Sequence, residues 1–353
     1  MIDRKKTRKI FIRDVPLGGE SPIPIQSMTT SKTKAIDSIV SEILRLEKAG
    51  CQLIRASLPD MDSVKAIPEI KSRINIPLIG DIHFNYKLAL EALEQGIDKI
   101  RINPGNIGNR TKVEKVLSRA SKHNVPIRIG VNSGSLEKDI LKKHGYPTAE
   151  AMLESAERHL NICREFGFDQ LVFSLKSSNV PLMIEANRKF SEKYDYPLHL
   201  GVTEAGTGWR AKVKSSLGIG TLLAEGIGDT IRVSLTDDPV EEIKAGQQIL
   251  KNLGLVSGGL DIISCPTCAR TQTDLIKIVK ELEKRTEHVQ KDLKIAVMGC
   301  AVNGPGEARE ADLGLACGKN GGLLFKNGKV IDTLPETEML DRLIEEIEKI
   351  PGK

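Results

Sequence analysis

Aromatic side chains are scarce in this sequence. Its 353 residues include seven Phe, four Tyr and one Trp, which together make up 3% of the chain. Proteins that bind single-stranded nucleic acid usually stack bases on several aromatic rings, so this class of partner is not expected. A strong surplus of one charge is missing too. The chain has 52 Lys and Arg and 47 Asp and Glu, which gives a net charge of +5. Such a mild surplus, spread along the chain, predicts no dedicated DNA-binding face.

Long apolar runs are also absent. No stretch approaches the roughly 18 apolar residues of a membrane-spanning helix, and the first residues, MIDRKKTRKIFIRD, lack the apolar core of a secretion signal. The same segment carries Asp3 and no Ser-rich amphipathic run, which argues against an organelle transit peptide. We therefore expect a cytoplasmic protein with no membrane partner.

One pattern recurs from about residue 22 to residue 254. A short β-branched or aliphatic run is followed by a turn and, in most cases, by a segment with helical spacing, such as Ala35–Lys48, Ala149–Phe166 or Val180–Lys193. The strand-like runs are 22–28, 52–58, 77–82, 99–103, 126–132, 170–176, 197–203 and 230–235. Eight such units favour a closed (β/α)8 barrel of the α/β class. An open doubly wound sheet is the alternative, although it usually has fewer strands.

The pattern breaks at a cluster of glycines, where we place a linker at about 255–262. The remaining residues predict a small α+β domain with helices at Gln272–Arg285 and Glu336–Lys349, a strand at Lys294–Met298 and a hairpin that turns at Asn327-Gly328. The expected domains are thus a barrel over residues 1–258 and a C-terminal domain over residues 259–353.

Cysteine is infrequent, and the six residues are unevenly placed: four of them lie in the last quarter of the chain. Cys265 and Cys268 form a CxxC motif, and Cys300 follows at a strand end before a Gly-Pro-Gly loop. In a reducing compartment these thiols are more suited to metal binding than to disulfides. An iron–sulfur cluster, a zinc ion and free thiols all remain open. A thiolate is the preferred fourth ligand of a cluster, which points to Cys317, whereas Glu307 would be an unusual and more labile ligand.

Charged and polar residues fall near the carboxyl ends of most barrel strands, which is the rim where barrel enzymes carry their chemistry. The candidates are Arg55, Asp81, His83, Arg101, Asn103, Arg128, Asn132, Lys176, Glu204 and Ser234. Three Arg and one Lys that converge on one rim indicate an anionic ligand, and Arg forks match phosphate oxygens well. The segment GTGWRA at 206–211 resembles a dinucleotide-binding loop, but it lies in the seventh unit rather than the first, so a nicotinamide site is not expected.

Seven segments together resemble a known enzyme family, 4-hydroxy-3-methylbut-2-enyl diphosphate synthase, in its short two-domain bacterial form. They are GDIHFNYKLAL (80–90), RINPGNIG (101–108), PIRIGVNSGSLEKD (126–139), HLGVTEAG (199–206), EGIGDTIRVSL (225–235), SCPTCART (264–271) and MGCAVNGPGEA (298–308). The resemblance covers nearly the whole chain. It departs from the family at AGTGWRAKVKS, so no ligand contacts are assigned to that loop.

The resemblance implies a (β/α)8 barrel followed by a domain that carries a [4Fe-4S] cluster. The family reduces 2-C-methyl-D-erythritol 2,4-cyclodiphosphate with two electrons from ferredoxin or flavodoxin, opening the ring and releasing water, in isoprenoid precursor biosynthesis. The resemblance implies that Cys265, Cys268, Cys300 and Glu307 are the cluster ligands, which sets aside Cys317 as a ligand. It also implies a head-to-tail homodimer in which the cluster of one chain caps the barrel of the other.

The family's ligand positions map onto the strand-end residues. The resemblance implies substrate binding by Arg55, Asp81, His83, Arg101, Arg128, Asn132, Lys176 and Ser234. We further expect Glu204, with its pKa raised by burial, to protonate the departing hydroxyl, and Glu307 to take part in catalysis as the labile ligand. Two rival interpretations are a zinc-stabilised barrel that only binds an anionic metabolite, and an aldolase that uses Lys176 as a Schiff base.

Overall fold

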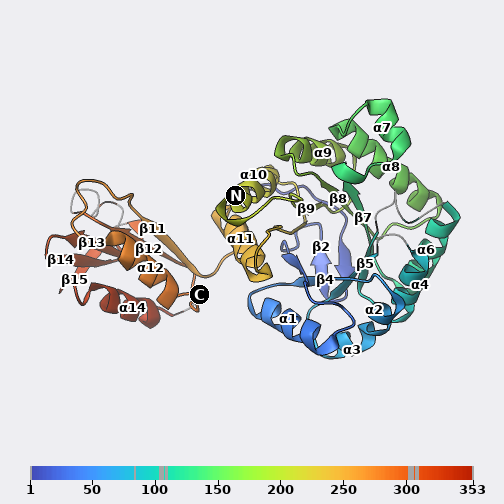
Figure 1. Cartoon of the computed structure of the whole chain (residues 1–353). Coiled ribbons are helices and arrows are strands. Elements are labelled where there is room, and N and C mark those ends of the chain that lie inside the picture. The colour runs from blue at the N-terminus through green and yellow to red at the C-terminus, as the bar shows by residue number, and fades with distance from the viewer. Residues whose placement is uncertain are drawn as a thin grey trace. The chain divides into compact units, whose positions relative to one another are not determined.

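The computed structural model describes residues 2–82, 85–102, 107, 110–300, 306 and 310–351. The chain divides into two compact units, Met1–Val256 and Ser257–Lys353 (Figure 1). Among the described residues, none of the helices combines the length and apolarity needed for a membrane span.

The first unit is built on eight short parallel strands. Their bounds are β3 Gln26–Met28, β4 Leu53–Ser57, β5 Leu78–Ile82, β6 Lys99–Ile102, β7 Ile127–Asn132, β8 Leu171–Lys176, β9 His199–Leu200 and β10 Thr230–Ile231. Strands β3 to β8 form one sheet in sequence order, and β9 pairs with β10. Two parallel bridges, Phe173 with Leu198 and Ile25 with Ile231, join these sheets at both edges. The barrel is therefore closed, and the open doubly wound alternative is wrong.

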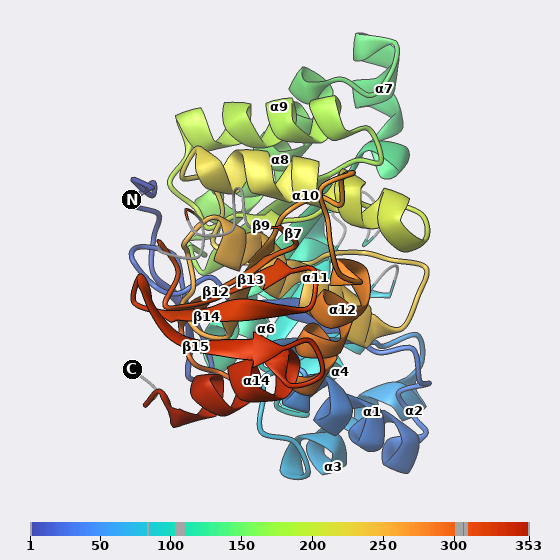
Figure 2. The ribbon, with the colours of Figure 1, turned by 90° about the vertical axis from the view of Figure 1, so that its left-hand side faces the viewer.

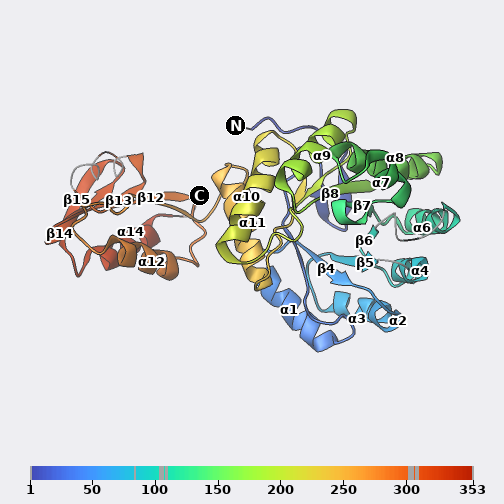
Figure 3. The same cartoon turned by 45° about the horizontal axis from the view of Figure 1, so that its top comes forward.

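Helices surround these strands on the outside (Figure 3). Their bounds are α1 Ile36–Lys48, α2 Met61–Lys65, α3 Ile67–Ser72, α4 Tyr86–Glu94, α6 Arg110–His123, α7 Lys138–His144, α8 Ala149–Glu165, α9 Val180–Lys193, α10 Gly208–Ala224 and α11 Pro239–Asn252, with a 3-10 turn at Ser133–Ser135. Several begin at a side chain that accepts a backbone N–H, for example Asn179 at α9 and Thr148 at α8. Such caps satisfy amide groups that have no partner within the helix.

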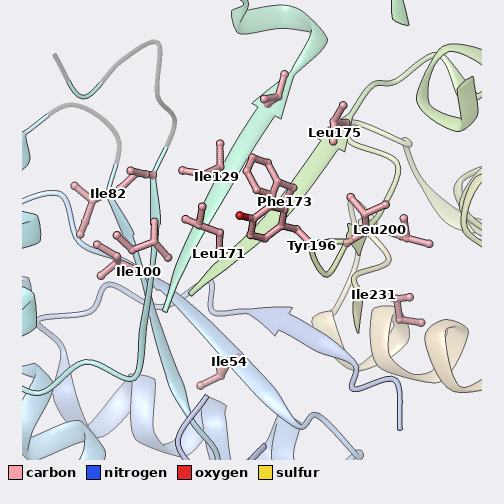
Figure 4. Close-up of a cluster of buried hydrophobic side chains, with 14 of the residues drawn as sticks. Ile54, Ile82, Ile100, Ile129, Leu171, Phe173, Leu175, Tyr196, Leu200 and Ile231 are labelled. Atoms are coloured by element: carbon pink, nitrogen blue, oxygen red, sulfur yellow. The ribbon is translucent and has the colours of Figure 1, made fainter. Parts of the chain in front are cut away.

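The hydrophobic core of this unit lies between the strands and the helices. Outward-facing strand residues such as Ile54, Ile100 and Phe173 are fully buried in it (Figure 4). The rings of Phe173 and Phe190, from β8 and α9, lie 4.7 Å apart at their centroids. Because successive strand residues point to opposite sides, this packing turns the intervening residues into the barrel interior.

An N-terminal hairpin that the strand pattern did not reveal packs against the amino ends of the barrel strands. It consists of β1 Ile10–Ile12 and β2 Val15–Leu17. Its buried residues Ile10, Ile12 and Leu17 form a separate apolar cluster with Leu53, Ile79 and Val172 of the barrel. The hairpin thus covers the end of the barrel opposite the predicted rim.

The second unit is a five-stranded sheet with two helices, which Figure 2 shows face on. Its elements are β11 Leu260–Ser264, α12 Leu275–Arg285, β12 Leu293–Met298, β13 Leu313–Gly318, β14 Gly321–Lys326, β15 Lys329–Pro335 and α14 Met339–Lys349. Both helices contribute to one apolar cluster against the sheet, through residues such as Leu282 and Leu343. The predicted hairpin turn is present, with positive φ at Asn327 and Gly328. β11 begins inside the segment expected to be a linker, because it pairs in parallel with β12.

Candidate functional site

The register of the strands places the interior side chains of the barrel in layers. In a barrel of this kind each layer takes one residue from every second strand. The pairings give a lowest layer of Leu53, Lys99, Val172 and Thr230, then Gln26, Ile79, Arg128 and His199, then Arg55, Arg101, Ser174 and Arg232. Asp81 and Met28 lie above these, and Lys176 and Ser57 one step higher. The interior is therefore polar and rich in cations, whereas an ordinary barrel core is aliphatic.

Two carboxylates partly balance the cations of the upper layers. Asp81 accepts a hydrogen bond from Arg101 at 3.2 Å and lies 3.8 Å from Nε of Arg55. Arg232 lies 3.5 Å from Glu242, which α11 supplies from outside the barrel. Burial lowers the pKa of Arg55 to about 10, and neighbouring Arg232 and Arg101 act in the same direction. The cations therefore remain in excess around Asp81.

Among the predicted residues, Lys176 and Arg128 have the most strongly lowered pKa values. Both side chains are buried, and burial is the first cause that holds the pKa of each well below its ordinary value. The next cause is other cations: Arg128 acts on Lys176, and Arg55 acts on Arg128. An anion with several oxygens would relieve this repulsion, so the interior is preorganised for a phosphate-like group.

Two interior glycines leave the room that these cations occupy. A Cβ at Gly130 would lie 2.6 Å from Nε of Arg101, and a Cβ at Gly201 would lie 2.6 Å from Nζ of Lys176 and 2.5 Å from the carbonyl oxygen of Arg232. Neither glycine has the positive φ that would explain it by backbone conformation. Their role is therefore to let charged side chains cross the interior of the barrel.

Most of the predicted substrate-binding residues come together in this interior. Arg55, Asp81, Arg101, Arg128, Asn132 and Lys176 all face inward from β4 to β8, and Ser234 is half-buried two residues beyond Arg232. His83 and Asn103 lie outside the described residues. The prediction missed Lys99, Arg232, His199 and Gln26. The alternation of the strands could have found Lys99 and Arg232, since each lies two residues from a residue that was chosen.

Glu204 differs from its expected environment. It follows β9 in a loop, its side chain is exposed, and its backbone has the left-handed φ of 52°. The expectation that Glu204 is buried is therefore wrong for the chain as described. A non-glycine residue held in this conformation is strained, and such strain is typical of functional loops.

The three cysteines expected to hold a cluster line one small pocket in the second unit. Its volume is about 110 Å³, and its lining includes Cys265, Cys268, Cys300 and Arg270. The backbone N–H of Gly299 donates to Sγ of Cys265 at 3.2 Å. Hydrogen bonds from Arg270, first from its backbone and then from its guanidinium, lower the pKa of Cys268. The thiolate of Cys268 is thus favoured, and the thiolate is the form that binds iron.

The donor set of this pocket, three cysteine sulfurs, is of the kind that holds an iron–sulfur cluster. Among the residues with described positions, no three His, Cys, Asp or Glu side chains form a group that could hold one metal ion. In a cluster each sulfur ligand binds a different iron, so this close convergence is not required. Glu307, the fourth ligand implied by the resemblance, lies outside the described residues.

Cys317 has a different environment from the other three cysteines. It is fully buried in the apolar cluster beneath α12 and α14, and burial raises the pKa of its thiol to about 12. It is not among the residues that line the pocket of the three cysteines. A neutral thiol in an apolar core acts as a small hydrophobic side chain.

Comparison with known proteins gives the family. Residues 7–247 match the family model described as the GcpE TIM-barrel domain, and residues 261–349 match the one described as the GcpE protein C-terminal domain. The chain belongs to the GcpE family. A protein of Clostridium perfringens named 4-hydroxy-3-methylbut-2-en-1-yl diphosphate synthase (flavodoxin) is 56% identical over 349 residues, which cover 99% of this chain and 100% of that protein. A Geobacillus kaustophilus protein of the same name is 54% identical over 350 residues, covering 99% and 94%.

Solved structures show the fold alone. A type I 3-dehydroquinate dehydratase from Clostridium difficile is similar with a TM-score of 0.53 and 18% identity, covering 70% of this chain and 98% of that chain. A dihydropteroate synthase from Stenotrophomonas maltophilia has a TM-score of 0.51 and 13% identity, covering 69% and 98%. The predicted barrel, the enzyme class and the family reaction are confirmed by the family models and the relatives.

Proposed function

We propose that this chain carries out the GcpE reaction with a [4Fe-4S] cluster in its C-terminal unit and a diphosphate site in its barrel. The reaction takes 2-C-methyl-D-erythritol 2,4-cyclodiphosphate to 4-hydroxy-3-methylbut-2-enyl diphosphate; two electrons enter, and the oxygen that is lost leaves as water. The observation that carries the proposal is one chain that combines a cation-rich barrel interior with three cysteines around a pocket.

The barrel's part is to bind and orient the cyclic diphosphate. Arg55, Arg101 and Lys176 lie in its upper layers, where a ligand that enters at the carboxyl ends of the strands would meet them, with Arg128 just beneath. Charge-assisted hydrogen bonds from these groups would fix the phosphates. Asp81 holds the guanidinium of Arg101 in place. Asn132, Ser234 and His83 complete the proposed substrate contacts.

The cluster's proposed ligands are Cys265, Cys268, Cys300 and Glu307. The three cysteines fit because they share one pocket, and the N–H of Gly299 already donates to one sulfur. When bound, the cluster supplies electrons singly and a Lewis-acidic iron. Arg270 adds a positive charge beside these sulfurs and favours the ionised form of Cys268.

Flavodoxin is the proposed electron donor, since the relatives carry it in their name. Ferredoxin is the alternative. The test is anaerobic turnover of the cyclodiphosphate by the full chain with reduced flavodoxin or reduced ferredoxin, with the product identified by mass. Formation of the open-chain diphosphate is expected. A protein that holds its cluster but leaves the cyclodiphosphate unchanged with either donor contradicts the proposal.

Glu204 is proposed to protonate the departing hydroxyl. Its support is the strained backbone that holds this residue in the loop after β9. We expect Glu204→Gln to lower kcat roughly 100-fold or more, the usual effect of losing a general acid, while KM stays within a few-fold. Steady-state kinetics with saturating flavodoxin measure both constants. An unchanged kcat would remove Glu204 from the mechanism.

The exposed Glu204 also supports the proposed head-to-tail homodimer, because proton transfer needs a cover that excludes water. In this arrangement the C-terminal unit of one chain would cap the barrel of its partner. Mixing Cys300→Ala with Glu204→Gln chains, each expected to be nearly inactive alone, tests it. Subunit exchange should then restore about a quarter of the wild-type activity, because half the dimers are hybrids with one complete site. A mixture that stays inactive, although mass spectrometry finds the hybrid dimers, would mean that each chain uses its own two units.

A further inference from the structure

Below the proposed substrate site, the barrel holds four polar side chains whose interior atoms have no partner. These are Gln26, Arg128 and His199 of one layer and Lys99 of the layer beneath. Each is at most 1% exposed. Lys99 Nζ, both ring nitrogens of His199, both amide atoms of Gln26, and Nε and Nη1 of Arg128 make no hydrogen bond within the described part of the chain. All four residues belong to strands or strand ends that the structure describes.

Leaving such groups unpartnered is costly. A buried polar group without a hydrogen bond costs about 1–3 kcal/mol, and an unpaired buried charge costs more. The charged groups that act on Lys99 are Arg128 and Arg55, both cations, and burial together with these two charges holds the pKa of Lys99 well below its ordinary value. Asp81 lies in a higher layer, where it contacts Arg101 and approaches Arg55. The lower layers therefore lack negative charge of their own.

The four side chains share one chemical property: each can donate a hydrogen bond. Lys and Arg are donors only, and His and Gln each offer at least one N–H. Hydrogen-bond donors that lack acceptors and lie around two cations form a site suited to an anion. They exclude a metal ion, for which Lys and Arg are not ligands.

The position of these layers limits the size of that anion. The hairpin cluster of Ile10, Ile12 and Leu17 seals the barrel beneath them. Above them, Arg55 and Arg232 retain some exposure, with side chains 12% and 17% accessible. A diphosphate that enters from the rim would meet those upper cations first. An ion held by Lys99 and His199 must instead be small enough to fit among side chains in a closed layer.

We propose that Gln26, Lys99, Arg128 and His199 bind a small inorganic anion of the halide class, with chloride as the physiological ion. The ion supplies the missing acceptor for four donors and a counter-charge for Lys99. It sits beneath the substrate's phosphates and is separate from them, and Arg128, which lies between the two sites, contributes to both. The proposal does not depend on the assigned reaction, because it rests on the unpartnered atoms of the lower layers.

Diffraction from crystals of the full chain grown in bromide tests the site without any variant. Data collected at the bromine absorption edge should show an anomalous peak among these four side chains. The peak should persist when pyrophosphate, used as a probe for the substrate site, is added. Water alone in the layer, or a bromide peak that pyrophosphate displaces, would overturn the proposal, the second because the substrate's phosphate would then be the ligand.

Thermal unfolding of the full chain gives an independent measurement. At constant ionic strength, replacing gluconate by chloride should raise the Tm of the wild type in proportion to the logarithm of chloride concentration once the site is near saturation. Lys99→Met should lose this dependence. Without chloride its Tm should be higher than that of the wild type, since no buried ammonium remains. Lys71→Met is the matched control, because Lys71 is paired with Asp98 at 2.6 Å. A chloride response in Lys99→Met equal to that of the wild type would contradict the site.

Discussion

Replacing Cys300 with alanine is expected to remove the iron and the activity together. Cys300 is buried and lines the same pocket as Cys265 and Cys268, so its loss would leave one iron of the proposed cluster without a thiolate and open the site to water. We expect turnover to fall by more than about 1,000-fold, because the missing group carries the electrons and not merely a binding contact. Iron and sulfide counts on the anaerobically purified variant, measured beside turnover, provide the test.

Cys317→Ala is the matched control for this variant. Cys317 is buried like Cys300, but it lies in the apolar cluster beneath the two helices and does not line that pocket. Its replacement should cost about 1 kcal/mol of stability through lost packing and leave iron, sulfide and turnover unchanged. If Cys317→Ala loses the cluster and Cys300→Ala keeps it, the ligand assignment is wrong.

Lys176→Met is expected to weaken substrate binding and, at the same time, stabilise the ligand-free protein. Lys176 is buried, and Arg128, Arg232, Arg55 and Arg101 all oppose its charge. Removing the ammonium relieves this repulsion, whereas a bound diphosphate loses a charge-assisted contact worth about 1.5–3 kcal/mol. We therefore expect KM for the cyclodiphosphate to rise roughly 10- to 100-fold and Tm without ligand to rise by several degrees.

The opposite signs of these two effects distinguish a binding residue from a structural one. A lysine that merely supported the fold would lower Tm when replaced. Lys212→Met serves as the control, since Lys212 pairs with Glu241 at 2.6 Å on the outer surface and should leave both KM and Tm nearly unchanged. A fall in the ligand-free Tm of Lys176→Met with an unchanged KM would contradict the proposed phosphate site.

Much of the fold follows from short-range patterns in the sequence. Alternating strand and helix segments predict the eight strands because each helix needs an apolar stripe and each buried strand an apolar outer face. The hairpin of β1 and β2 was not predicted, since Ile10, Ile12 and Leu17 gain their burial only from contacts with β4, β5 and β8. Likewise the predicted linker at about 255–262 overlaps the start of β11, because the burial pattern of this strand is weak and its pairing with β12 is non-local.

The candidate site was predictable where motif and strand position agree, as for Arg55, Arg101 and Lys176. The layers beneath were not predicted, because a lysine in a strand more often points toward solvent along an outer helix than into a barrel. Lys99 reveals its direction only through the register that places Ile100 in the outer core. The exposure of Glu204 could not be predicted either, since it depends on a loop conformation with a left-handed residue.

The most direct test of the account is the metal content of the chain purified without oxygen, determined together with its visible spectrum. We predict a brown protein with about four iron and four sulfide per chain and no zinc. A colourless protein that cannot be reconstituted with iron and sulfide, and that instead holds one zinc per chain, would contradict the central claim. The barrel and its cations would then describe an anion-binding protein without the proposed reductase chemistry.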